Sequence, residues 1–338
     1  MKKIAKSLII FTSLLFGVVT LTTVDVQAQD FLPALGDDRT GTDGFQFIKI
    51  MVDPRSAALS GSNAADASAG ASLYWNPAVA SQAEKNEFMG SHTEYFADIS
   101  MEYFSYVHHL DFITLGASVQ FLNSGSIKET TEFQPLGTGR TFKTNHISAG
   151  LTASQKLTDS FSYGITARII TEKIEELSNT TAALDFGLFY RVGETGARFS
   201  VGVSNFGIDG TPSGDTERPT LDGEEAISEF EDVTVPTRFN LSLAYDIVET
   251  ELNTFMLTAQ ITNVSDESEL LSMGGEYGFM DQFFLRTGFS FGRDEMNLPS
   301  VGAGFKLPVS DKEFNFDYAF TSFERLDNIH RVALRLSF

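Results

Sequence analysis

The sequence contains no cysteine, which excludes disulfide bonds, cysteine-based metal sites and cysteine nucleophiles. After the first thirty residues it has no apolar run of about eighteen residues, which excludes transmembrane helices. Basic residues are scarce, because 24 Lys and Arg face 45 Asp and Glu and give a net charge of −21. Such a field repels nucleic acid, which is therefore not expected as a partner. Phenylalanine is abundant, with 31 residues, whereas Trp75 is the single tryptophan.

The first 28 residues have the pattern of an export signal. Lys2, Lys3 and Lys6 precede a mostly apolar segment over 7–19, and small residues follow at 26–28. The apolar segment is too short to span a bilayer comfortably. We predict a signal peptide over 1–28, with an uncleaved membrane anchor as the alternative.

From about residue 86 onwards, apolar and polar residues alternate with the period of a β-strand. In 237–247, for example, one face carries Phe239, Leu241, Leu243, Tyr245 and Ile247. Fourteen such segments occur, most of about ten residues, the length that a tilted strand needs to cross a bilayer. They are 86–96, 101–109, 112–122, 143–156, 161–172, 182–191, 197–206, 236–247, 253–263, 268–278, 282–291, 298–306, 313–321 and 329–338.

The connections between these segments alternate between short turns and mostly longer loops. Every second gap is short, as at 157–160 and 279–281, while the other gaps include 123–142, 173–181 and 207–235. This asymmetry is typical of outer-membrane barrels, whose short turns are periplasmic and whose long loops are extracellular. We therefore predict an all-β fold, a fourteen-stranded antiparallel transmembrane β-barrel over 86–338, with a soluble β-sandwich as the alternative. The terminal Phe338 resembles the signal that outer-membrane insertion machinery reads.

Residues 29–85 are too irregular for strands, and fourteen strands enclose more space than their own side chains can fill. We predict that 29–85 form a plug inside the barrel, with a periplasmic extension as the alternative. Its stretch 57–72 consists almost entirely of Ala, Ser and Gly, which permit close approach to the wall. Asn76 and Pro77 predict the start of a short helix over 77–83, and Tyr74 and Trp75 are expected to anchor it.

The segment 47–78 resembles the N-terminal signature of the PorV/PorQ family, which is similar in turn to the FadL-type fatty-acid transporters, fourteen-stranded barrels with an N-terminal hatch. The matching positions are the apolar lead at 47–50, Arg55, and the string Leu73, Tyr74, Trp75, Asn76, Pro77 and Ala78. The chain departs from the usual Gly-rich turn at 59–61. The resemblance implies a Bacteroidetes-type outer membrane and a role in type IX secretion.

Patterns typical of catalysis or cofactor binding are not found. His108 and His109 point to opposite faces of a strand and cannot form a simple metal site. His146 shares a face with Ser148, which would suit a hydrolase but is also common in a polar lumen. The segment 37–44 lacks the spacing of a calcium loop. We expect no enzyme activity, no cofactor and no metal.

The loop 207–235 is strongly acidic and is a candidate docking surface. One interpretation is a solvated extracellular loop without a partner. The other is a docking surface that contacts a basic partner, or lipopolysaccharide through divalent cations. The candidate residues are Asp215, Glu217, Asp222, Glu224, Glu225, Glu229, Glu231 and Asp232.

Two functions remain open from the sequence. The resemblance favours a non-enzymatic component of type IX secretion that receives cargo through its C-terminal signal domains or anchors the attachment machinery, with cargo, translocon or attachment complex and outer-membrane lipid as partners. The alternative is a FadL-like channel for fatty acids or other hydrophobic solutes. A continuous apolar pocket between plug and wall would favour the channel, and a packed polar lumen would oppose it.

Overall fold

The computed structural model describes residues 43–220, 223–227, 229–292, 298–323 and 328–338, without the side chains of 217–228. The predicted signal peptide and the first part of the predicted plug lie outside these residues. No helix in the described ranges is long and apolar enough to cross a membrane.

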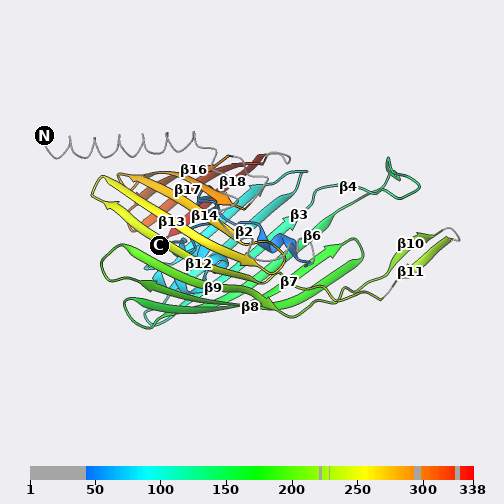
Figure 1. The fold of residues 1–338 in the computed structure, drawn as a ribbon, viewed down its shortest axis with the longest axis horizontal. Coiled ribbons are helices and arrows are strands. Elements are labelled where there is room, and N and C mark those ends of the chain that lie inside the picture. Colours follow the sequence, from blue (N-terminus) through cyan, green and yellow to red (C-terminus); the bar gives the residue numbers. More distant parts are fainter. Residues whose placement is uncertain (1–42, 221–222, 228, 293–297, 324–327) are drawn as a thin grey trace. The chain divides into compact units, whose positions relative to one another are not determined.

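Within the described residues, fourteen antiparallel strands pair into a closed barrel, as the alternation predicts (Figure 1). Closure pairs the backbone groups of every strand with a neighbour on each side, which is what a sheet in lipid requires. The ring order is β1, β18, β17, β16, β15, β14, β13, β12, β9, β8, β7, β6, β3, β2 and back to β1. The strands are β1 (Glu87–Glu94), β2 (Ser100–His109), β3 (Thr114–Asn123), β6 (Thr144–Lys156), β7 (Phe161–Ile174), β8 (Leu177–Arg191), β9 (Ala197–Gly207), β12 (Arg238–Glu249), β13 (Asn253–Val264), β14 (Leu270–Phe279), β15 (Phe283–Phe291), β16 (Ser300–Val309), β17 (Lys312–Ser322) and β18 (Asn328–Ser337).

Large apolar side chains cover the outward face of the barrel and polar ones its inward face. On β12, Leu241 is 43% exposed whereas its neighbour Ser242 is 1% exposed. Leu151 and Leu334 are likewise exposed on the outer surface. An outward face of this kind is suited to contact with lipid. The alternation in the sequence therefore corresponds to the lipid-facing and lumen-facing sides of a membrane-spanning wall.

Three of the predicted loops differ from expectation. The segment 173–181 is mostly strand, because β7 and β8 continue towards each other and leave a tight turn at Glu175 and Glu176. Both strands keep alternating and pairing there, and Glu175 takes the left-handed conformation that closes the turn. The loops 123–142 and 207–235 each contain a short hairpin, β4 (Ile127–Lys128) with β5 (Thr141–Phe142), and β10 (Thr216–Thr220) with β11 (Gly223–Ile227).

Residues 43–85 fill the interior with short helices. They are η2 (Gln46–Lys49), α2 (Pro54–Ala58), α3 (Ala69–Trp75) and η3 (Pro77–Gln82). Apolar plug residues such as Phe45, Ile48 and Trp75 form one buried cluster with wall residues that include Met101 and Ile170. The predicted helix after Asn76 is present as a 3₁₀ helix, and α3 before it is an element that the sequence reasoning missed.

A closed barrel should resist unfolding in detergent because no strand has a free edge from which pairing can unravel. We expect the full-length protein to migrate faster on unboiled than on boiled denaturing gels. A migration that heating does not change would contradict a closed barrel.

Candidate functional site: the plug and its contacts with the wall

Trp75 fixes one end of the plug to the start of α2. The indole Nε1 donates to Asp53 Oδ1 at 3.0 Å, and Asp53 Oδ2 accepts from Ser56 N at 2.9 Å as the N-cap of α2. Pro54 occupies the first helical position, where no backbone donor is needed. One buried carboxylate therefore caps a helix and orients the indole, and the anchoring role of Trp75 stays a prediction.

Two arginines of the wall bind the carbonyl groups at the C-terminal end of α3. Arg168 Nη2 on β7 donates to Leu73 O at 3.3 Å, and Arg238 Nη2 on β12 donates to Tyr74 O at 3.1 Å. Arg238 also donates to the hydroxyl of Tyr74 and lies over the rings of Tyr74 and Trp75, at 4.5 and 5.2 Å from their centroids. Carbonyls at the end of a helix lack partners within the helix, and cationic donors suit them.

Asn76 joins the plug directly to the backbone of the wall. Its Nδ2 donates to Leu188 O on β8 and to Val201 O on β9, at 3.2 and 3.1 Å. Its Oδ1 accepts from Ala78 N at 2.9 Å and caps η3, as predicted. The plug therefore binds the wall here through main-chain groups.

Three glycines of the wall, here called the glycine window, permit this approach. Gly164, Gly187 and Gly202 are paired in register on β7, β8 and β9. A Cβ atom at Gly164 would lie 2.5 Å from the backbone carbon of Pro77, and one at Gly187 would lie 2.0 Å from Asn76 Oδ1. A side chain at Gly164 or Gly187 would therefore displace the plug.

An apolar hollow lies over the glycine window. Its volume is about 490 Å³, and the three glycines line it together with side chains of β7, β8 and β9. Those side chains are Tyr163, Ile165, Phe186, Leu188, Val201 and Val203. Because most of them are exposed on the outward face, the hollow opens towards lipid. Beside it, the pairing of β8 with β9 is irregular between Leu184 and Phe186.

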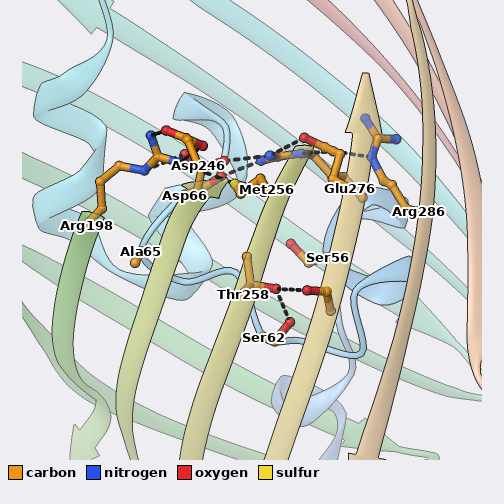
Figure 2. Close-up of polar contacts among 12 residues, drawn as sticks. Ser56, Ser62, Ala65, Asp66, Arg198, Asp246, Met256, Thr258, Glu276 and Arg286 are labelled. Carbon is orange, nitrogen blue, oxygen red and sulfur yellow. Dashed lines mark hydrogen bonds and ion pairs between the residues drawn. The ribbon is translucent and has the colours of Figure 1, made fainter. Parts of the chain in front are cut away.

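On another part of the wall, a chain of ion pairs connects the plug to the barrel (Figure 2). Arg55 of α2 binds Glu276 on β14 through two bonds of 2.8 and 2.9 Å and Asp66 of the plug at 2.6 Å. Asp66 in turn lies 3.2 Å from Arg198 of β9. Burial opposes the charge of Arg55, but Glu276 and Asp66 outweigh it and raise the arginine's pKa above its ordinary value.

The series of ion pairs continues along the wall in both directions. Arg198 binds Asp246 at 2.6 Å, and on the other side Glu276 binds Arg286. Arg286 binds Asp317 at 2.5 Å, and Asp317 binds Arg335 at 3.0 Å.

Each charge at the two contacts between plug and wall also has a partner on its own side. Arg55 and Asp66 pair within the plug, while Glu276 keeps Arg286 and Arg198 keeps Asp246 within the wall. Withdrawal of the plug would therefore break the ion pairs of Arg55 with Glu276 and of Asp66 with Arg198 without leaving any of these four charges alone. A buried charge that loses its partner is the main cost of breaking such pairs, and this arrangement avoids it.

The structure brings the predicted motif residues together but not the other candidates. Arg55 and the residues 73–78 all lie in the plug. Phe338 pairs its backbone with Asn86 beside β1, and its role in insertion stays a prediction. His146 stacks on Phe47 whereas Ser148 accepts from Arg168, so these two residues have separate partners and do not form a catalytic pair. Among the described residues, no group of acidic or histidine side chains is placed to hold a metal.

The predicted acidic docking surface is described only in part. Asp222 lies outside the described residues, and the side chains of Glu217, Glu224 and Glu225 are not described. Asp215, Glu229 and Glu231 are solvent-exposed, and Asp232 accepts a hydrogen bond from Thr211. The docking role of this loop stays a prediction.

Sequence reasoning missed the wall side of the site. The partners of the plug that it did not single out are Arg168, Arg198, Arg238, Glu276 and the glycine window. Arginines at inward positions of the predicted strands could have indicated these contacts, because a charge enclosed in the lumen requires a partner there.

A comparison of two buried carboxylates tests the redundancy of the ion pairs. Asp185 is the carboxylate bound to Arg168. Asp317 instead lies between Arg286 and Arg335. Each of these two arginines also has a second carboxylate, which is Glu276 for Arg286 and Glu87 for Arg335. We expect Asp185→Asn to lower the free energy of unfolding by about 3–5 kcal/mol. The matched variant Asp317→Asn should cost less. Unfolding midpoints in detergent measure both, and equal losses would contradict the redundancy.

The glycine window makes a second prediction. Gly164→Ala places a methyl group against the backbone of Pro77, so we expect the plug to shift and limited proteolysis to cleave it faster. Gly275→Ala on β14 is the control, because its Cβ atom would meet nothing closer than 3.6 Å. Equal protection of the plug in both variants would show that close contact at the window does not hold it.

The comparisons with known proteins concern the fold. No protein-family model and no curated protein matches the sequence, so the resemblance to PorV/PorQ stays a prediction. Among solved structures, the toluene transporter TodX of Pseudomonas putida matches with a TM-score of 0.59 and 15% identity over 85% of this chain and 98% of that chain.

Two further solved structures match at similar levels. The toluene transporter TbuX of Ralstonia pickettii has a TM-score of 0.55 and 12% identity, over 88% of this chain and 98% of that chain. A FadL homologue of Pseudomonas aeruginosa has a TM-score of 0.54 and 11% identity, over 85% and 98%. The chain is thus a β-barrel that shares the fold of FadL-type outer-membrane channels.

Proposed function

We propose that the protein is an outer-membrane channel for small hydrophobic solutes, closed in this structure by its plug. The observation that carries the proposal is the apolar hollow on the lipid face, which lies over the same three glycines that the plug contacts from inside. The solved proteins with this fold include transporters of toluene, which supports a hydrophobic solute. The short turns would face the periplasm and the long loops the exterior.

The geometry favours a lateral route through the wall. At the glycine window no side chain separates the plug from the hollow, so the sheet backbone alone forms the barrier. The irregular pairing of β8 with β9 leaves this part of the ladder weaker than its surroundings. Movement of Asn76 and Pro77 away from the window would expose the lumen side of the same spot.

Passage requires the plug to move. Between plug and wall, a cavity beside Trp75 and Arg238 measures about 50 Å³. A cavity of about 150 Å³ holds a benzene molecule, so a single aromatic ring does not fit there. The divided ion pairs of Arg55 and Asp66 ease release, because both charges keep a partner when the plug leaves. Lys49 of the plug would give up Asp266 and Glu267 of the wall.

The second candidate is the role in type IX secretion that the resemblance implies. In favour of it, the side chains of the motif at 73–78 are used to hold the plug in place, and the lumen around Arg55 is packed with ion pairs. A barrel closed in this way would act through its loops, with secreted cargo, the translocon or the attachment complex as partner. Lipopolysaccharide is a proposed neighbour of the acidic loop.

A disulfide lock separates these candidates. Ser62 Oγ of the plug lies 2.5 Å from Thr258 Oγ1 of the wall, and the chain has no cysteine of its own. In cells that lack their own hydrocarbon channel, we expect the protein to increase uptake of labelled toluene or oleate. The double variant Ser62→Cys/Thr258→Cys should lose this uptake when oxidised and regain it on reduction.

The single variant Ser62→Cys is the control for effects of the thiol itself. Uptake no greater than that of cells without the protein would contradict the channel. Recovery of secreted cargo or of a translocon barrel by affinity purification in mild detergent would then favour the secretion role.

A further inference from the structure

Residues 62–66 of the plug, here called the Asn63 segment, lie against the inward face of β12 and β13 (Figure 2). The backbone nitrogen of Ala64 donates to Gln260 Oε1 at 3.3 Å, and that of Ala65 donates to Ser242 Oγ at 3.2 Å. The segment therefore meets the wall through side-chain acceptors rather than through the backbone of a strand.

The side chain of Asn63 is enclosed in this contact without a partner. Asn63 is 0% exposed, and neither its Oδ1 nor its Nδ2 forms a hydrogen bond within the described part of the chain. Both atoms are inaccessible to solvent, so water does not replace the missing partners. An amide that is buried without hydrogen bonds destabilises the state that encloses it.

Two residues of the wall beside the Asn63 segment also have buried polar atoms without partners. Ser200 lies opposite Ser242 in the pairing of β9 with β12, and Asn240 precedes Ser242 by two positions on the same face of β12. Ser200 Oγ and Asn240 Nδ2 are buried, and neither has a partner among the residues that the structure describes. Polar groups on both sides of this contact are therefore left without hydrogen bonds.

The contact of Asn76 with the wall differs in this respect. Asn76 is 1% exposed, so it is buried as deeply as Asn63. Its Nδ2 donates to two carbonyls of the wall, and its Oδ1 accepts from Ala78. The two asparagines of the plug therefore have opposite effects, because the amide of Asn76 stabilises the closed state and that of Asn63 opposes it.

The charges at the end of the Asn63 segment permit its separation from the wall. Asp66 lies 3.2 Å from Arg198 of β9. If this pair separates, Asp66 keeps Arg55 of the plug at 2.6 Å, and Arg198 keeps Asp246 of the wall at 2.6 Å. Neither charge is left without a partner, which is the main cost of breaking a buried ion pair.

The cavity of about 50 Å³ between plug and wall adjoins the Asn63 segment. Its lining includes Ser60 and Gly61, which directly precede the segment, and Gln260, whose side chain accepts from the segment. Glu267, in the connection between β13 and β14, also lines it. Separation of the Asn63 segment would therefore enlarge an existing space along β12 and β13.

We propose that the Asn63 segment is the release point of the plug, where plug and wall separate first. Water would satisfy the buried polar atoms of Asn63, Ser200 and Asn240 once the segment leaves the wall. The contact at Asn76 gains nothing from water, because its hydrogen bonds are already complete. The inference rests on the plug movement that the proposed function requires, and it names the segment that begins this movement.

Hydrogen exchange of the full-length protein in detergent, resolved to single amides, tests the proposal without a solute. The amides of Ala64 and Ala65 report the contact of the Asn63 segment, and the amide of Ala78 reports the contact at Asn76. After correction for intrinsic rates, Ala64 and Ala65 should exchange at least about tenfold faster than Ala78. Sucrose favours the less hydrated state, so it should slow exchange at Ala64 and Ala65 more than at Ala78.

The variant Asn63→Ala removes the unpartnered amide without adding volume. Exchange at Ala64 and Ala65 should become about tenfold slower, because the closed state no longer encloses this amide. Asn179→Ala is the matched control, since Asn179 Oδ1 on β8 is also buried without a partner but its Nδ2 donates to Gly210 O, away from the Asn63 segment. This control should leave exchange at Ala64 and Ala65 unchanged.

The outcomes separate the release point from the channel itself. Equal exchange at the two contacts of the unaltered protein would overturn the proposal, as would unchanged or faster exchange at Ala64 and Ala65 in Asn63→Ala. Neither result depends on whether cells take up toluene or oleate. The expected exchange pattern without any uptake would support the release point and count against the channel alone.

Discussion

The structure depends on one constraint, which is that every charge enclosed by the barrel must find a partner within it. A ring of fourteen strands satisfies its own backbone but leaves an interior that its side chains do not fill. The inward positions hold arginines that cannot reach bulk water, so the plug supplies carbonyls, rings and carboxylates to them. The charges of the wall are therefore stabilised by groups of the plug, although plug and wall are separate segments of the chain.

Much of the fold followed from local patterns in the sequence. Alternation located the fourteen strands, the number of strands implied a filled lumen, and Asn76 before Pro77 located a helix start. These features are set by neighbours in the chain, which is why they could be predicted. The tight turn between β7 and β8 was missed because polar residues at a strand end look the same in a loop.

The site was harder to predict because its contacts join residues far apart in the chain. Arg55 is 221 residues from Glu276, and nothing in either segment indicates the other. The helix α3 was missed since Ala, Ser and Gly at 57–72 suit both a helix and an extended segment in close contact. Likewise, Gly164, Gly187 and Gly202 form a window only when the strand register is known.

The bonds of Asn76 have a consequence for how the wall can vary. They end on carbonyl groups of Leu188 and Val201, whose side chains point the other way, towards lipid. Substitutions at these two positions could adapt the hollow to solutes of different size without altering what holds the plug. Selectivity and closure are thus encoded on opposite faces of the same residues, and each can change while the other is kept.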